Sequence, residues 1–337
     1  MDLKGKTVTL AHGAGGKQTA GLIEQVFKAH FANPYFTADD AAVLPAPAGR
    51  IAMTTDGFIV SPRFFRGGNI GKLSICGTVN DLACMGAKPL YLTCAFVIEE
   101  GFPLEQLEEI AAAMEKTAKE AGVVIVAGDT KVAGRGQVDG VFITTTGIGR
   151  IGEDVHPSGR LAKNTDSVLV TGDIGRHGCC ILLERDEFGI DAKVSSDCAP
   201  LWGSVEALLR EIPDVHVIRD ATRGGVGTVL YEIAKESGVG FLLDQEAIPV
   251  DPSVRGVTGM LGLDPMYLAC EGTLVIIVPQ EKTERALEIL RAQEHSTGAA
   301  VIGRVTDTEK GHVVMQTAIG TQTYLPQPGN ELLPRIC

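Results

Sequence analysis

Aspartates stand beside apolar or glycine-rich segments at several places in the chain. Burying a carboxylate there is costly unless a cation or a hydrogen-bond donor compensates it. Mg²⁺ takes oxygen ligands and commonly bridges carboxylates to the phosphates of a substrate. A turn or a helix cap is the alternative for each aspartate, and it explains Asp81 least well, because Asp81 falls in the middle of a predicted helix with small and apolar neighbours. The predicted metal ligands are Asp39, Asp40, Asp56, Asp81, Asp129 and Asp220.

Two glycine-rich segments have the composition of phosphate-binding loops. His12–Lys17 (His-Gly-Ala-Gly-Gly-Lys) is not a Walker A loop, because Gln18 stands where that motif requires Ser or Thr. The second segment, 219–225, precedes a predicted helix, whose free N–H groups and dipole favour phosphate. A flexible terminus and simple capping by a threonine are the respective alternatives. The phosphate contacts predicted from these segments are Gly15, Gly16, Lys17, Thr222, Arg223, Gly224 and Gly225.

The last residue, Cys337, is the candidate nucleophile or acyl carrier. It ends a segment, 326–337, whose three prolines and one glycine exclude a helix, so we expect an extended tail. In an extended chain Arg335 lies on the same side as Cys337 and favours its thiolate. Glu271, beside a glycine at a predicted strand start, is the candidate base, with a surface turn as the alternative. An incidental terminal residue is the alternative for Cys337.

The other seven cysteines predict structure rather than chemistry. They lie among apolar or small residues, and the sequence has no Cys-x-x-Cys pair. Cysteine in such surroundings usually behaves as a small buried hydrophobe. We therefore expect these seven to be buried and free.

Strand and helix patterns alternate through both halves of the chain, which predicts an α/β (α+β) protein. Strands are expected near 51–55, 91–98, 123–127 and 138–150, and helices over 18–30, 73–85 and 103–121. The second half has the same style, with strands near 167–171, 215–218, 239–243, 273–278, 300–305 and 312–315, and helices near 176–187, 200–211, 225–237 and 282–293. We expect a flexible glycine-rich segment at 1–40, domains at 41–155 and 156–325, and the tail at 326–337.

Composition narrows the class of protein. A chain of 337 residues exceeds what one core usually fills, so two domains are the default. A net charge of −12 disfavours nucleic acid and anionic membranes as partners. The sequence shows no apolar run of the roughly 18 residues that span a membrane, and its start lacks an apolar signal core. We expect a cytoplasmic protein.

The motifs together resemble a known family. They are His12–Lys17, Asp39–Ala42, Thr54–Gly57, Val79–Ala87, Ala127–Val132 and Arg219–Gly225. These are similar to the family of aminoimidazole ribonucleotide synthetase (PurM), selenophosphate synthetase and thiamine-phosphate kinase. The ending Pro334–Cys337 (Pro-Arg-Ile-Cys) is similar to that of its hydrogenase maturation branch, the HypE family.

The resemblance implies a two-domain PurM-like fold. The first domain would form a strand barrel across a homodimer, and the second would be an α/β sandwich beside it. ATP would lie between the domains, with Mg²⁺ bridging its phosphates to the aspartates, chiefly Asp81 and Asp129. The motifs add Asn80, Thr130 and Lys131 as nucleotide contacts.

The resemblance also implies a reaction and partners. A carbamoyltransferase, HypF, would load the thiol of Cys337, and the enzyme would dehydrate the carbamoyl group to a thiocyanate with ATP. A HypC–HypD complex would accept the cyanide for [NiFe]-hydrogenase iron. Two alternatives remain open: a selenophosphate synthetase-like enzyme, although residues 12–17 contain no cysteine, and a carrier that only presents Cys337.

Overall fold

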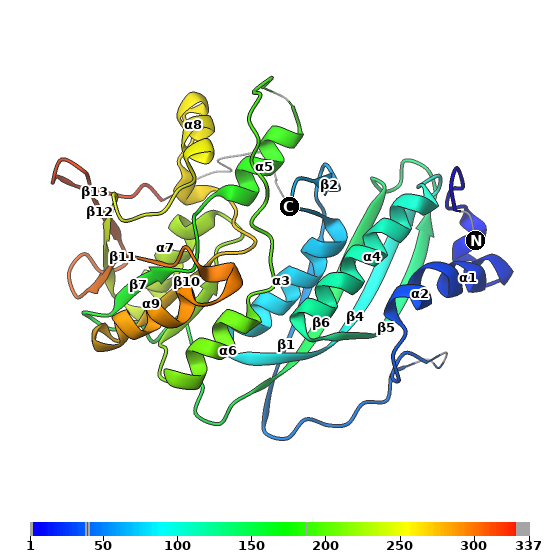
Figure 1. Ribbon diagram of the computed structural model, residues 1–337, viewed down its shortest axis with the longest axis horizontal. Helices are drawn as coiled ribbons and strands as arrows, with labels where there is room; N and C mark the ends of the chain where they lie inside the picture. The colour runs from blue at the N-terminus through cyan, green and yellow to red at the C-terminus, as the bar shows by residue number, and fades with distance from the viewer. Residues whose placement is uncertain (1–2, 38, 40, 187, 328–337) are drawn as a thin grey trace.

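The computed structural model describes residues 3–37, 39, 41–186 and 188–327. It divides into two α/β units (Figure 1). They meet at helix α3 and also where α5 contacts β2 and α6 contacts β4. Cys337, Arg335 and Asp40 lie outside the described residues. In the described part of the chain no helix is long and apolar enough to cross a membrane.

The N-terminal unit is a four-stranded sheet covered on one face by two helices (Figure 1). The strand order is β1-β6-β4-β5, antiparallel except for the β4–β5 pair. The sheet stays open within one chain, and Ile51 and Met53 on its uncovered face are 52% and 67% exposed. The elements are β1 (Arg50–Phe58), β2 (Phe64–Phe65), β3 (Gly68–Asn69), α3 (Ile70–Cys84), β4 (Ala87–Glu99), α4 (Leu104–Ala121), β5 (Val124–Ala133) and β6 (Val141–Ile151).

Residues before β1 pack on this unit rather than standing apart from it. Val8, Leu22, Val26, Phe27 and Phe31 are buried in the same core as α4 and β4. The spacing of the last four places them on one face of the helical segment 17–31, which explains the packing despite the glycine-rich start. The expected flexible segment at 1–40 therefore contains a structured part. Its elements are the 3₁₀ helix η1 (Leu10–Gly13), α1 (Lys17–Leu22), the π-helical turn η2 (Ile23–Phe27) and α2 (Lys28–Phe31).

The C-terminal unit is a seven-stranded sheet with helices on both faces. Its order is β13-β12-β9-β11-β7-β10-β8. Apolar side chains alternate between a core beneath α7 and another beneath α6 and α9, so all five residues of β10 are buried. The elements are β7 (Ser167–Val170), α5 (Arg176–Glu184), α6 (Trp202–Glu211), β8 (Val217–Asp220), α7 (Gly225–Ser237), β9 (Gly240–Asp244), α8 (Pro252–Leu261), η3 (Pro265–Tyr267), β10 (Leu274–Val278), η4 (Gln280–Lys282), α9 (Thr283–Arg291), η5 (Glu294–Ser296), β11 (Ala300–Thr306), β12 (Val313–Gln316) and β13 (Gln322–Tyr324).

Helix α3 is buried on almost every side because it is sandwiched between the first sheet and the second unit. It packs on β1 and β6 and also contacts β8 and α6. Thirteen of its fifteen residues are buried. A polar side chain on this helix therefore faces the sheet, helix α4 or the domain junction.

Most predicted elements are confirmed, although the short strands β2, β3 and β13 were not predicted. Helix α8 was not predicted, because Gly256 and Gly259 weaken its pattern although Asp251 caps it. Asp56 and Asp129 lie inside β1 and β5, whereas the sequence placed both at strand ends. The seven cysteines that the structure describes are free and buried, as expected.

Candidate functional site

Asp81 and Asp56 face each other between α3 and β1. The hydroxyl of Thr54 donates to Asp81 Oδ2 at 2.7 Å. Asp56 lies on the same face of β1, because its cross-strand partner Thr145 donates to the Ser74 carbonyl of α3. Burial, together with the carboxylate of Asp56, raises the pKa of Asp81 to about 6. The two carboxyl groups are thus held close together in a setting that disfavours their charge.

Asp220 joins this pair from the other unit. It ends β8, the strand that contacts α3. Burial, and then the nearby Asp81, raise the pKa of Asp220. Arg219 lowers the pKa of both carboxyl groups, but its guanidinium is itself paired with Glu232 at 2.6 Å. We call Asp56, Asp81 and Asp220 the α3 cluster.

The glycine-rich turn after β8 presents a helix N-terminus beside the α3 cluster. The Thr222 hydroxyl donates to Asp220 Oδ2 at 3.2 Å, so the capping alternative for Thr222 is wrong. The N-cap is Gly224, and among the described residues no side chain caps α7. Gly224 and Gly225 have φ of 72° and 62°, and a Cβ on Gly225 would lie 2.6 Å from two backbone carbonyl oxygens. Only glycine fits this turn, whose Gly225 N–H donates to the Thr222 carbonyl at 3.4 Å. The end of the helix that begins here favours an anion through its dipole.

Asp129 lies elsewhere, on β5. The Lys131 ammonium contacts its carboxylate at 2.7 Å, and the Thr130 N–H donates to it at 2.8 Å. The hydrogen bond from Lys131 lowers the pKa of Asp129, which is exposed. The glycine-rich loop lies alongside, because a Cβ on Gly13 would meet Val132 at 3.0 Å. We call Asp129, Thr130 and Lys131 the β5 group.

The α3 cluster and the β5 group are separated within one chain. Strands β1 and β5 are opposite edges of the sheet, three spacings of ~4.8 Å or about 14 Å apart. Asp129 also lies on the uncovered face of the sheet. It is paired with Ala95 of β4, whose side chain points to the face opposite to that of its buried neighbours Cys94 and Phe96. The structure therefore gathers Asp56, Asp81 and Asp220 but leaves Asp129 apart.

The α3 cluster suits a divalent cation. Across the residues described, no three His, Cys, Asp or Glu side chains already converge as a metal site. Nevertheless, two of the three carboxyl groups have raised pKa values caused by burial and by one another. A bound cation would relieve that repulsion and let them ionise, and hard carboxylate oxygens are the ligands that Mg²⁺ prefers.

Asn80, a nucleotide contact implied by the resemblance, makes hydrogen bonds across the domain junction. Its amide Nδ2 donates to the carbonyls of Ala199 at 3.0 Å and Glu271 at 3.3 Å. Its Oδ1 accepts from the Leu201 N–H at 2.8 Å. The side chain is 3% exposed and connects α3 to the second unit. The spacing in the sequence could not reveal these bonds, because all three partners are distant in the chain.

Glu271 is buried, at 6% exposure, so the surface-turn alternative is wrong. Next to it lies a residue that the sequence analysis missed, Asp197. Its carboxylate accepts from the N–H groups of Glu271 at 3.2 Å and Gly272 at 3.0 Å. Burial raises the pKa of Asp197, and those backbone donors lower it in part. The segment around Asp197 has no regular secondary structure, so no periodic pattern marked it.

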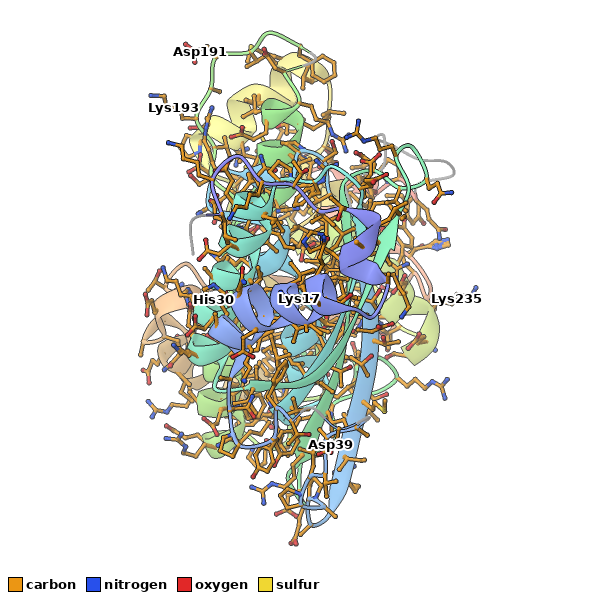
Figure 2. All side chains as sticks on the ribbon, turned by 90° about the vertical axis from the view of Figure 1, so that its right-hand side faces the viewer. Lys17, His30, Asp39, Asp191, Lys193 and Lys235 are labelled. Atoms are coloured by element: carbon orange, nitrogen blue, oxygen red, sulfur yellow. The ribbon has the colours of Figure 1, made fainter. Side chains whose placement is uncertain are left out.

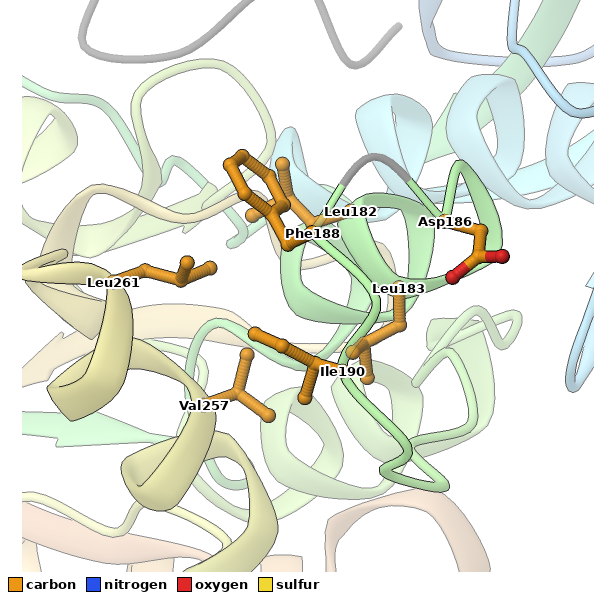
Figure 3. Close-up of a pocket in the computed structure, with 7 residues that line it drawn as sticks. All are labelled: Leu182, Leu183, Asp186, Phe188, Ile190, Val257 and Leu261. Atoms are coloured by element: carbon orange, nitrogen blue, oxygen red, sulfur yellow. The ribbon is translucent and has the colours of Figure 1, made fainter.

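Two further predicted residues, Asp39 and Lys17, lie apart from each other. Figure 2 shows Asp39 well below Lys17, toward the far end of the sheet. Lys17 opens α1 and, with His12 and Gln18, lines a hollow beside α4. An apolar pocket between α5 and α8 contains none of the predicted residues (Figure 3); its lining is Leu182, Leu183, Asp186, Phe188, Ile190, Val257 and Leu261.

Comparison with known proteins decides the family. Residues 38–151 match the AIR synthase related protein N-terminal domain, and residues 164–316 match the corresponding C-terminal domain. The carbamoyl dehydratase HypE of Azotobacter vinelandii is 45% identical over 338 aligned positions, which cover 100% of this chain and 99% of that protein. The chain belongs to the HypE family.

Solved HypE structures agree with this assignment. A crystal structure of hydrogenase maturation protein HypE in complex with ATP superposes with a TM-score of 0.94 at 47% identity, covering 98% of this chain and 100% of that one. The structure of a HypE–HypF complex matches with a TM-score of 0.81 at 48% identity, covering 91% and 99%. The two-domain PurM-like fold and membership of a carbamoyl dehydratase family, both expected from the sequence, are confirmed.

Proposed function

We propose that this HypE-family chain uses ATP to dehydrate a carbamoyl group on its own Cys337 to a thiocyanate, the source of the cyanide ligand of [NiFe]-hydrogenase iron. The observation that carries the proposal is the α3 cluster, which places buried carboxyl groups beside the uncapped N-terminus of α7. A relative of 47% identity with a TM-score of 0.94 binds ATP. Cys337 is the thiol that we propose as the carrier.

Phosphate contacts follow from the geometry of the second unit. The N–H groups at the start of α7 and the guanidinium of Arg223 would hold phosphate oxygens. Asp56, Asp81 and Asp220 would hold Mg²⁺, which supplies charge neutralisation of the phosphates when bound. Ionised carboxylates are needed for this, so ATP and metal binding should deprotonate Asp81.

The chemistry uses phosphate as a leaving group in place of hydroxide. The carbamoyl oxygen attacks the γ-phosphorus, the bond to ADP breaks, and the carbamoyl nitrogen loses one proton. The resulting S–C(OPO₃)=NH group then loses its second N–H proton, the C–O bond breaks, and S–C≡N and inorganic phosphate form. Glu271 is the base we assign to these proton transfers, and Arg335 would favour the thiolate of Cys337 during loading. Orientation of the reacting oxygen supplies most of the remaining acceleration.

Two copies of the chain would complete the site. The α3 cluster and the β5 group lie at opposite edges of an open sheet whose uncovered face carries the exposed Ile51 and Met53. Pairing two such sheets into a barrel would cover these side chains and could bring the β5 group of one copy to the α3 cluster of the other. A homodimer is therefore our proposed assembly. HypF, which forms a complex with a relative, is the proposed carbamoyl donor, and a HypC–HypD complex the proposed cyanide acceptor.

The direct test follows the mass of the C-terminal peptide after incubation with HypF, carbamoyl phosphate and ATP. The wild-type chain should first gain a carbamoyl group and then lose one water. Cys337→Ala should gain nothing, whereas the matched control Ile336→Ala, which keeps the thiol, should still be loaded. Loading of Cys337→Ala would move the carrier to another cysteine. Loading without ATP turnover or water loss would favour the carrier alternative.

A further inference from the structure

The backbone at residue 271 is held from two sides. On its N–H side, the carboxylate of Asp197 accepts from Glu271 at 3.2 Å and from Gly272 at 3.0 Å. On its carbonyl side, Asn80 Nδ2 donates to Glu271 O at 3.3 Å, and the Ala199 N–H approaches the same oxygen at 3.4 Å. Hydrogen bonds to both its N–H and its carbonyl fix the backbone of residue 271. They thereby fix the point from which the Glu271 side chain extends.

The Asp197 carboxylate accepts hydrogen bonds from three consecutive residues. Besides the N–H groups of Glu271 and Gly272, the Thr273 hydroxyl donates to Oδ2 at 3.4 Å. The approach is close enough that a Cβ on Gly272 would lie 1.8 Å from the Asp197 carbonyl oxygen. Both oxygens of the Asp197 carboxylate are required for these bonds, because Oδ1 accepts from the Glu271 N–H and Oδ2 from the Gly272 N–H.

Asn80 links residue 271 to the α3 cluster. It precedes Asp81 in α3, so a rigid helical turn connects the amide that holds Glu271 O to the carboxyl group that faces Asp56. Its bonds to Ala199 O and Leu201 N fasten the same helix to the segment that follows Asp197. The hydrogen bonds of Asp197 and of Asn80 to residue 271 thus belong to one hydrogen-bonded junction between the domains.

We propose that Asp197 and Asn80 are positioning residues for the dehydration step. They fix the position of Glu271 relative to the α3 cluster. The proposal rests on the proposed function, in which Glu271 removes the carbamoyl N–H protons. Neither side chain touches the reacting atoms in this account. Each acts through the backbone of residue 271.

The test begins with Asp197→Asn. An amide offers one acceptor oxygen, so one of the two N–H groups at 271–272 would face an NH₂ group and the turn would shift. Because a misplacement of ~1 Å can cost ~100-fold, we expect kcat for dehydration to fall about 10- to 100-fold. The KM for ATP and the extent of Cys337 carbamoylation should stay unchanged. Asp173→Asn is the matched control: it removes a nearby carboxylate that pairs with Arg176, and it should dehydrate at close to the wild-type rate.

A double variant separates positioning from a general structural defect. If Asp197 acts only through Glu271, Asp197→Asn combined with Glu271→Gln should be no slower than Glu271→Gln alone. If the two losses multiply, the positioning role is wrong while the base role of Glu271 stands. If Glu271→Gln dehydrates at the wild-type rate, the assignment of the base fails and this inference fails with it. Should Asp197→Asn not fold, Asn80→Ala, which removes the hold from the opposite side, enters the same cycle with the same expected outcome.

Discussion

The α3 cluster and the β5 group contain the same kind of residue in opposite electrostatic states. Burial raises the pKa of Asp81 to about 6, whereas the hydrogen bond from Lys131 lowers the pKa of the exposed Asp129. Asp81 faces other carboxyl groups, while Asp129 already has a cation 2.7 Å away. The presence of an aspartate in a motif therefore does not determine its pKa, which depends on the burial and the charge of the groups around it.

The difference indicates that the two regions have different functions. Carboxyl groups that repel one another gain from a divalent cation, so the α3 cluster is the stronger candidate for the metal. Asp129 gains less, because Lys131 compensates it, and the lysine can itself approach a phosphate. In the proposed homodimer, the β5 group of a second copy would contact the substrate side of the nucleotide.

The largest expected effect comes from Asp81→Asn. Removing a charge that the Mg²⁺–ATP complex needs should lower the dehydration rate by at least ~100-fold while leaving carbamoylation of Cys337 intact. The same substitution removes a buried repulsive charge, so we expect the ligand-free protein to gain about 1 kcal/mol in its free energy of unfolding at pH 7.5. Mass spectrometry and denaturant unfolding measure the two effects. Unchanged dehydration would remove Asp81 from the site.

Mixed dimers test whether the two regions meet across subunits. Equal amounts of the Asp81→Asn and Asp129→Asn chains are mixed, unfolded and refolded together. Half of the dimers should then be hybrids that contain one chain of each kind. Each hybrid would have one site with both substitutions and one site with neither, which restores about a quarter of wild-type dehydration. Each variant alone should stay near background. A mixture no more active than its parents would mean that both aspartates serve the same copy, or different steps.

The pH dependence of ATP binding is expected to follow Asp81. Its pKa is raised from 3.8 to about 6, so ionisation for metal binding becomes easier as pH rises through 6. Affinity for Mg²⁺–ATP should rise about fourfold between pH 5.5 and 7.5, and calorimetry should show proton release at the lower pH. The free energy of unfolding without ligand should change in the opposite sense, falling from pH 4 to pH 6, because the folded protein retains a proton that the unfolded chain has lost. Asp81→Asn should weaken both dependences and leave the part that comes from Asp220, whose pKa is also raised by burial.

Lys131→Ala should have the smallest effect on stability. The pair with Asp129 is exposed, and such pairs contribute about 0–1 kcal/mol, so the free energy of unfolding should change by less than ~0.5 kcal/mol. The pKa of Asp129 should rise toward its ordinary value, which NMR titration of the side chain would detect. A stability loss well above 1 kcal/mol would contradict the picture of an exposed pair.

Elements with strong local signals were predictable. Pro103, a one-sided apolar pattern and Gly122 predicted α4, and Gly122 does end it with φ of 70°. The apolar neighbours of Asp81 predicted the buried helix α3. In each case the information lies within one or two turns of chain, where periodicity and backbone preference act directly.

The sequence by itself determined the fold family, the helix that carries Asp81, and the terminal thiol of Cys337. Only the tertiary structure decided which aspartates meet: Asp56, Asp81 and Asp220 come together across the domain junction, and Asp129 does not. It also decided that Asn80 and Asp197 hold residue 271. The physical reason is that motifs record local backbone needs, whereas burial, pKa and hydrogen-bond partners depend on residues brought together from distant parts of the chain.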